Sequence, residues 1–168
     1  MYGMNYGYRT SLNKSMKKHI LEKKKILKEI VNLKKNSTVL DIGSNDGTFL
    51  NSFNKEKFNL IGIDPTIKKF GKYYKPSIIK SSKFFSYKNF KQVSKKSKAN
   101  LITSFSMFYD LQDPLKFTKD INKCLDVNGI WHFEQSYLLD MIKKNSYDTI
   151  CHEHLEYYSI HSINYIIK

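Results

Sequence analysis

The chain has 168 residues and a formal net charge of +14, and a chain of this length can bury most of its unfolded surface in one domain. Its two cysteines, Cys124 and Cys151, lie far apart and form no C-x-x-C pair, so the sequence indicates neither a disulfide framework nor a cysteine-rich zinc site. No apolar run reaches the length of a membrane span, and the N-terminus lacks the apolar core of a signal peptide. These features predict a cytoplasmic protein with no membrane anchor.

The positive charge consists almost entirely of lysine. Arg9 is the one arginine among 29 basic residues, whereas specific phosphate and base contacts favour the bidentate arginine fork. Nucleic acid is therefore not the expected partner, although the charge would attract an anionic small-molecule substrate.

The apolar pattern predicts helices and strands in alternation. A first amphipathic helix, capped by Ser11, is predicted to run to about Lys35. Strands are predicted at 37–42, 58–63, 77–80, 100–105 and 130–134, the last after a turn ended by Gly129. Helices are predicted around 49–53, at 67–74, at 87–98, and from Pro114 behind a capping Asp113. The alternation predicts an α/β, Rossmann-like, mostly parallel sheet of about five strands with helices on both faces and a long helix before it.

The end of the chain carries an unfinished apolar pattern. Ile160, Ile163, Ile166 and Ile167 begin a helical apolar face that stops at Lys168. We therefore expect the natural protein to continue beyond this point. The predicted division is an N-terminal segment and helix at 1–36, a Rossmann-like core at 37–144, and a substrate-side segment at 145–168.

A glycine turn, D-I-G-S-N-D-G-T, follows the first predicted strand at residues 41–48. Ligands of open parallel sheets bind beyond the carboxyl ends of the strands, so this turn is the first candidate site. Gly43 lets the backbone approach a ligand closely, and Gly47 lets the next helix start against the strand. The spacing is not the G-x-G-x-x-G of a dinucleotide site, which predicts a ligand without phosphates at this point.

Asp64 ends the second predicted strand, about twenty residues after the turn, where a carboxylate can accept both ribose hydroxyls of an adenosine. Turn and carboxylate together resemble the class I methyltransferases, and this resemblance implies S-adenosylmethionine as the cofactor. The cofactor-binding residues that it implies are Asp41, Gly43, Ser44, Asn45, Gly47, Asp64, Pro65, Phe84, Ser106 and Met107. The structural alternative is an ordinary strand-to-helix turn with a helix-capping Asp64.

Four stretches, 6–11, 39–48, 62–66 and 145–154, resemble one branch of that superfamily, the sugar C-methyltransferases that act on nucleotide-linked 4-keto-deoxysugars. The H-E-H sequence at 152–154 is the most specific of the matches. Members of the branch also carry an N-terminal zinc-binding domain and a C-terminal domain, and neither is found in this chain.

The resemblance implies methylation at carbon. His154 would remove the proton beside the keto group, Glu153 would orient His154 or hold the substrate, and Tyr6 or Tyr8 would close over the methyl donor. Histidine suits this role because its neutral ring accepts a proton near neutral pH. The substrate would be an anionic nucleotide sugar, with contacts expected from His152, Tyr147, Glu134 and Gln135.

Three residues depart from the pattern of the branch. Cys151 stands where a tyrosine is usual before H-E-H, Asp110 stands where a histidine follows the fourth strand, and Lys83 stands where an acidic residue often flanks the adenine. The first two departures weaken the assignment to a sugar substrate. At Lys83, either backbone N–H groups replace the acidic side chain or the cofactor binds more weakly.

Other interpretations stay open. In an extended segment Cys151 and Glu153 point to one side and His152 and His154 to the other, so no metal site is expected. The histidines could instead belong to a loop that satisfies them with hydrogen bonds. Rival functions are an O- or N-methyltransferase acting on another small molecule, and a non-catalytic cofactor-binding fragment or basic interaction module.

Overall fold

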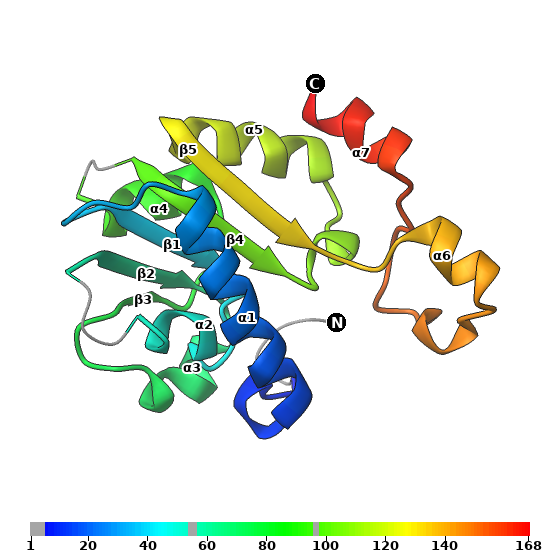
Figure 1. Cartoon of the computed structure of the whole chain (residues 1–168), viewed down its shortest axis with the longest axis horizontal. Helices are drawn as coiled ribbons and strands as arrows, with labels where there is room; N and C mark the ends of the chain where they lie inside the picture. Colours follow the sequence, from blue (N-terminus) through cyan, green and yellow to red (C-terminus); the bar gives the residue numbers. More distant parts are fainter. Residues whose placement is uncertain (1–5, 54–56, 96–97) are drawn as a thin grey trace.

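A computed structural model describes residues 6–53, 57–95 and 98–168, so residues 1–5 of the predicted N-terminal segment lie outside the described residues. A five-stranded sheet in the order β3-β2-β1-β4-β5 forms the centre of the molecule (Figure 1). Its strands are β1 (Thr38–Ile42), β2 (Asn59–Ile63), β3 (Ile79–Ser81), β4 (Ala99–Phe105) and β5 (Leu125–Glu134). Every neighbouring pair is parallel, which confirms the predicted fold. The chain changes direction across the sheet between β1 and β4, and this is where an open parallel sheet binds its ligand.

Helices cover both faces of the sheet. They are α1 (Lys14–Ile30), α2 (Thr48–Asn51), α3 (Ile67–Phe70), α4 (Tyr87–Val93), α5 (Pro114–Cys124), α6 (Leu138–Lys143) and α7 (Ile160–Ile167). Side chains alternate along each strand, so Val39 packs with α1, α2 and α3 while Leu40 packs with α4, α5 and α7. The result is a three-layer α/β/α arrangement, with α6 beyond the arrowheads of the strands (Figure 1).

The first helix begins and ends differently from its prediction. Asn13, not Ser11, caps α1, because the Asn13 side chain accepts the Met16 N–H while Ser11 lies in a 3-10 turn, Thr10–Leu12. The helix ends at Ile30 instead of Lys35, because Val31 adopts an extended backbone and is buried in the core. Tertiary packing therefore overrides the helical pattern at both ends.

The last strand begins at Leu125, earlier than predicted, and contains Gly129 in its interior. A Cβ at Gly129 would lie 2.7 Å from the Ala99 carbonyl oxygen, next to a register shift between Ala99 and Leu101. Gly129 therefore permits a close backbone approach at a bulge and does not end a turn.

Smaller boundary errors affect three further elements. β3 occupies Ile79–Ser81 instead of 77–80, and the helix predicted at 67–74 is α3 followed by a 3-10 turn, Gly71–Tyr73. α4 ends at Val93, and residues 96–97 of its predicted extension lie outside the described residues.

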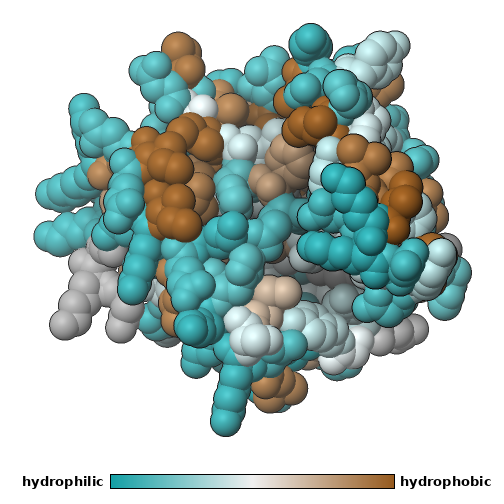
Figure 2. All heavy atoms as spheres, turned by 45° about the vertical axis from the view of Figure 1, so that its right-hand side comes forward, coloured by the Kyte–Doolittle hydropathy of each residue, from teal (hydrophilic) through white to brown (hydrophobic). Residues whose placement is uncertain are grey.

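The C-terminal apolar pattern forms the predicted helix, α7. Ile163 is buried in the core and Ile166 packs against it, whereas Ile160 and Ile167 are exposed. On the face drawn in Figure 2, hydrophobic side chains gather in separate patches between hydrophilic ones. Among the described helices, none combines the length and the hydropathy that crossing a membrane requires. The division at residues 36 and 144 stays a prediction.

Candidate active site

The glycine turn connects β1 to α2 through a left-handed backbone. Gly43, Asn45 and Gly47 have φ values of 69°, 49° and 75°. A Cβ at Gly43 would lie 3.3 Å from Met107, and one at Gly47 would lie 2.8 Å from the ring of Tyr74. Position 47 therefore needs a glycine for two reasons: the Tyr74 ring leaves no room for a Cβ, and the backbone has a positive φ.

Two cavities flank this turn, and both include Gly43 and Met107 in their walls. The first has a volume of about 320 Å³ and is lined by Tyr6, Tyr8, Thr10, Met16, Ile20, Asp41, Gly43, Ser44, Asn45, Thr48, Phe49, Phe105, Ser106, Met107 and Tyr109. The second, of about 260 Å³, is lined by Ile42, Gly43, Ile63, Pro65, Phe84, Phe85, Ser86, Met107, Asp110, Leu111, Asp113, Lys116, Phe117 and Asp120. Adjacent cavities at the carboxyl edge of the sheet offer space for a ligand that spans the turn.

Asp41 brings a carboxyl group to the wall of the first cavity. It is 3% exposed, and its Oδ1 accepts a 2.7 Å hydrogen bond from the Thr103 hydroxyl. Burial raises the pKa of Asp41 to about 8, the Thr103 hydrogen bond lowers it, and the charge of Asp64 raises it. A positively charged group in the cavity would stabilise the ionised form, so Asp41 is suited to hold a cationic part of a ligand.

Asp64 accepts backbone hydrogen bonds on both of its carboxylate oxygens. It is fully buried, and its two oxygens accept the backbone N–H groups of Asn45 at 2.7 Å and Thr66 at 2.6 Å. Pro65, by contrast, lines the second cavity. The arrangement of Asp64 matches the structural alternative in which it stabilises the turn, and its ribose contact stays a prediction.

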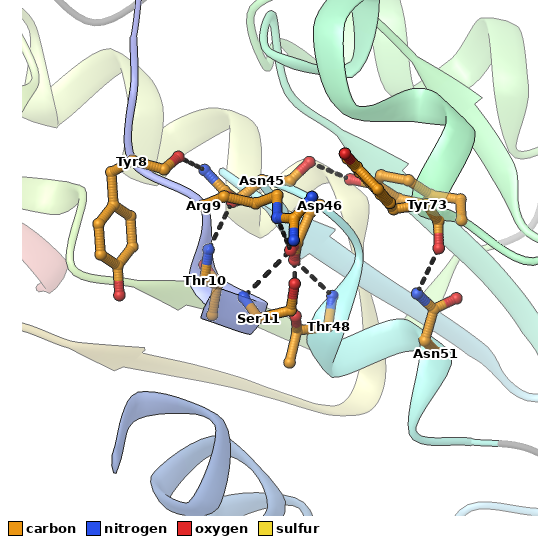
Figure 3. A network of polar contacts seen from close by, with 10 residues as sticks. Tyr8, Arg9, Thr10, Ser11, Asn45, Asp46, Thr48, Asn51 and Tyr73 are labelled. Atoms are coloured by element: carbon orange, nitrogen blue, oxygen red, sulfur yellow. Dashed lines mark hydrogen bonds and ion pairs between the residues drawn. The ribbon is translucent and has the colours of Figure 1, made fainter. Parts of the chain in front are cut away.

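The polar side chains of the turn bind the N-terminal segment (Figure 3). The Asn45 side chain accepts the Thr10 N–H and donates to the Tyr8 carbonyl, both at 3.0 Å. Asp46 accepts the Ser11 N–H at 3.0 Å and lies 3.7 Å from the Arg9 guanidinium. Asn45, which was predicted to bind the cofactor, therefore uses its side chain to hold residues 8 and 10 beside the first cavity.

The Ser44 hydroxyl likewise interacts with another side chain of the protein. The Tyr74 hydroxyl donates to the Asn45 carbonyl at 2.9 Å, and the Ser44 hydroxyl lies 2.8 Å from the same tyrosine oxygen. Burial raises the pKa of Tyr74, so it stays a neutral donor. The sequence did not indicate this role, because Tyr74 stands only at the end of a predicted helix.

The H-E-H segment lies against the loop that follows β4. The rings of His154 and Tyr109 are 4.1 Å apart, and the N–H groups of Leu155 and Glu156 donate to the Tyr109 carbonyl at 3.0 and 3.2 Å. Tyr109 also lines the first cavity, so these contacts place the H-E-H segment next to one wall residue of that cavity, although His154 itself lines neither cavity beside the turn.

His154 is held in one tautomer. Its Nδ1 lies 2.8 Å from the Thr149 carbonyl oxygen. A carbonyl can only accept, so Nδ1 carries the hydrogen and Nε2 of the neutral ring keeps its lone pair. The Thr149 carbonyl was not anticipated as the group that orients the ring. Glu153, predicted for this task or for holding the substrate, is exposed.

Tyr6 and Tyr8 both line the first cavity, and their rings meet edge to face at 6.3 Å. Burial is the main cause that raises the pKa of Tyr6, followed by the negative charges of Glu153 and Asp110. Tyr6 therefore interacts electrostatically with carboxylates of the H-E-H segment and of the loop after β4. Tyr109 was not predicted as a site residue, although it follows the fourth strand at the sheet edge where ligands bind.

The remaining cofactor candidates lie at the cavities. Ser106 and Met107 line the first, where Ser106 has a φ of 50° and its N–H donates to the Glu134 carbonyl at 2.7 Å. Phe84 lines the second and is 66% exposed, which leaves one side of that cavity open. The Lys83 ammonium donates to the Gln92 side chain at 2.9 Å, and Lys83 does not line this cavity.

The substrate candidates are scattered. Glu134 accepts from His19 at 2.6 Å and lies 3.4 Å from the Lys23 ammonium, so it ties α1 to β5. Tyr147 is 72% exposed and lines a separate cavity of about 210 Å³ beside α6. His152 is exposed. Gln135 has a buried Oε1 without a hydrogen-bond partner among the described residues. None of these four side chains lines either cavity beside the turn.

These features define a Rossmann-like domain whose candidate ligand site lies at the carboxyl edge of its sheet. The chain belongs to a methyltransferase family, since the model of a methyltransferase domain matches residues 13–168.

Individual methyltransferases also resemble this chain in sequence or in structure. C-methyltransferase NovU of Streptomyces niveus is 24% identical over 160 residues, which cover 95% of this chain and 38% of NovU. The chain thus spans well under half the length of that relative. The methyltransferase in complex with the Haloferax volcanii Trm112 activator has a TM-score of 0.68 at 13% identity, over 92% of this chain and 69% of that one. The plantazolicin methyltransferase BpumL, in complex with SAH, has a TM-score of 0.66 at 15% identity, over 89% of this chain and 61% of that one. Both structures share the fold.

Proposed function

We propose that this chain is the cofactor-binding and base-carrying part of an S-adenosylmethionine-dependent methyltransferase. Its acceptor is a carbon beside the keto group of a nucleotide-linked deoxysugar or a similar carbohydrate. The observation that carries the proposal is the orientation of His154, whose Nε2 lone pair is kept available beside the Tyr109 wall of the first cavity. The similarity to NovU, a C-methyltransferase, supports chemistry at carbon.

The residues around the turn fit the proposed cofactor. Asp41 offers a buried carboxyl group to an α-ammonium group, and Gly43 leaves its backbone accessible between the two cavities. Pro65, Phe84 and Phe85 give the second cavity the flat apolar walls that suit an adenine ring. When bound, S-adenosylmethionine supplies an electrophilic methyl group, and the protein contributes position and polarity.

Residues of the chain accept the proton, exclude water and attract the substrate. Nε2 of His154 accepts the proton from the substrate carbon, while the Thr149 carbonyl keeps Nδ1 protonated throughout. Tyr6 and Tyr8 cover the first cavity and limit the access of water to the site. The excess of lysine attracts the anionic nucleotide part of the substrate.

Calorimetry with S-adenosylhomocysteine tests the cofactor assignment. We expect binding to the wild-type chain and a loss of about tenfold or more in affinity for Asp41→Ala, because a charge-assisted hydrogen bond disappears. Asp148→Ala removes an exposed carboxylate as a matched control and should bind as the wild type does. Equal affinity of the Asp41 variant and the wild type would rule out the proposed role of Asp41.

Proton exchange tests the chemistry at carbon. A thymidine-diphosphate-linked 4-keto-6-deoxyhexose is incubated with the protein in deuterated water, and deuterium at the carbons beside the ketone is measured by NMR. We expect incorporation that depends on the protein. Methyl transfer to an oxygen or nitrogen without such incorporation would favour the rival O- or N-methyltransferase.

A further inference from the structure

Asp110 carries a buried oxygen atom that the proposed function does not yet use. It lies at the end of the 3-10 turn Phe108–Asp110 after β4 and lines the second cavity. Its Oδ1 is buried and has no hydrogen-bond partner among the described residues. A buried carboxylate oxygen without a partner is unfavourable unless a nearby charge or a ligand compensates it.

Several titratable groups surround this carboxyl group. Burial raises the pKa of Asp110 to about 6, the charge of His154 lowers it, and the charge of Glu153 raises it. Asp110 in turn raises the pKa values of Tyr6 and Tyr109. Among these four neighbours, His154 is the one that gains a positive charge when it accepts a proton.

The backbone keeps Asp110 and His154 near each other. Tyr109, the residue before Asp110, packs its ring at a tilt against the His154 ring, and its carbonyl accepts hydrogen bonds from the two N–H groups that follow the H-E-H sequence. The neighbouring rings of Phe108 and Tyr158 pack at 5.3 Å, so the loop and the segment are also joined in the core. Their relative placement therefore does not depend on exposed side chains alone.

We propose that Asp110 is the positioning residue for the His154 base: its carboxylate faces the imidazole and stabilises the imidazolium that forms when Nε2 accepts the substrate proton. The inference rests on the proposed function of His154. In this step the substrate C–H bond breaks, an N–H bond forms at Nε2, and the electron pair stays on the substrate as an enolate. The positive charge that appears on the ring is balanced by a carboxylate already in place.

The contact can be tested in the protein without cofactor or substrate. Carboxyl carbon NMR follows the titration of Asp110 in the wild type and in His154→Gln. We expect the midpoint to rise in the variant, because the positive charge that favours the ionised carboxylate has been removed. Glu156→Gln, which changes an exposed carboxylate in the same segment, is the control and should leave the midpoint in place. An unchanged midpoint in His154→Gln would overturn the proposal.

A double-mutant cycle tests the function of the contact with the exchange assay described above. Asp110→Asn should lower kcat for exchange about tenfold or more with little change in KM, and it should cost nothing further in the His154→Gln background. Losses that multiply instead would show that Asp110 acts independently of His154, which would also overturn the proposal. If the wild type exchanges no proton, the proposed function fails, whereas the NMR titration still decides whether the two side chains interact.

Discussion

The glycine turn and the H-E-H segment meet at the same edge of the sheet, yet they differ in how their polar side chains are used. Five polar residues in the turn or next to it are each at most 6% exposed: Asp41, Ser44, Asn45, Asp46 and Asp64. In the H-E-H segment, Cys151, His152 and Glu153 are exposed and His154 is only partly covered.

The hydrogen bonds explain the difference. In the turn, the Asn45 and Asp46 side chains bind the N-terminal segment, and Asp64 binds backbone N–H groups. In the H-E-H segment, backbone N–H groups and one ring nitrogen hold the chain in place, which keeps Nε2 of His154 available. Substitutions in the turn should therefore lower stability first, and substitutions at His154 should lower rate first.

The largest expected effect is on the rate of His154→Gln. Loss of a general base should slow protein-dependent deuterium incorporation into the keto sugar by about 10² to 10⁴-fold. The melting temperature should change little, because the ring is partly exposed and its loss leaves the core intact. His161→Gln, an exposed histidine on α7, is the matched control for rate. An equal loss of exchange rate in both variants would show that His154 has no special role in the reaction.

Gly47→Ala tests whether the glycine turn contributes to the stability of the fold. A Cβ would lie 2.8 Å from the Tyr74 ring on a backbone with a φ of 75°. Strain and overpacking together should lower the free energy of unfolding by roughly 2–4 kcal/mol, measured by urea denaturation. Gly7→Ala is the control, because nothing lies within 4 Å of its Cβ position. Equal stability of the two variants would contradict the packing described for the turn.

Asp41 should make stability depend on pH. Burial in the fold raises its pKa from an ordinary value of 3.8 to about 8. The native state therefore keeps a proton that the unfolded chain releases, so this contribution to stability is complete below pH 4 and is lost as the pH rises through 8. Relative to Asp41→Asn, the wild type should lose up to about 1.4 kcal/mol per pH unit within this window. Urea titrations of both proteins at several pH values measure the difference, and parallel curves would show that Asp41 is not buried in this way.

The sequence predicted the fold well because the fold depends on patterns within short stretches. The alternation of apolar strands with amphipathic helices was enough for the parallel sheet. Both ends of α1 and the start of β5 were predicted wrongly, because they depend on partners distant in sequence. Val31 leaves the helix to enter the core, and Gly129 lies against Ala99 across the bulge.

The sequence predicted which residues lie at the candidate site better than it predicted what each of them does there. The carboxyl edge of a parallel sheet brings Asp41, Gly43 and Met107 together, so their vicinity followed from topology. The commitment of Asn45 to residues 8 and 10, and the orientation of His154 by Thr149, could not be predicted. Both depend on loop conformations for which the sequence carries no periodic signal.

The smallest expected effect concerns how the turn holds the N-terminal segment. Asn45→Gly removes the side chain that accepts the Thr10 N–H, and glycine tolerates the φ of 49° at this position. The lost hydrogen bond should favour local opening by about 1–2 kcal/mol. Amide exchange at Thr10, followed by NMR, should therefore become about tenfold faster or more, while exchange in β1 stays as in the wild type.

Asn36→Gly is the matched control for this experiment, because Asn36 is exposed and has a φ of 68°. It repeats the same substitution in the same backbone region without touching the N-terminal segment. Thr10 exchange should be unchanged in this variant. If Asn45→Gly also leaves Thr10 exchange unchanged, the segment is held by other contacts, and Asn45 becomes available for the ligand role that its position in the turn first indicated. Faster exchange throughout β1 would instead show that the turn and the segment open as one unit with the sheet.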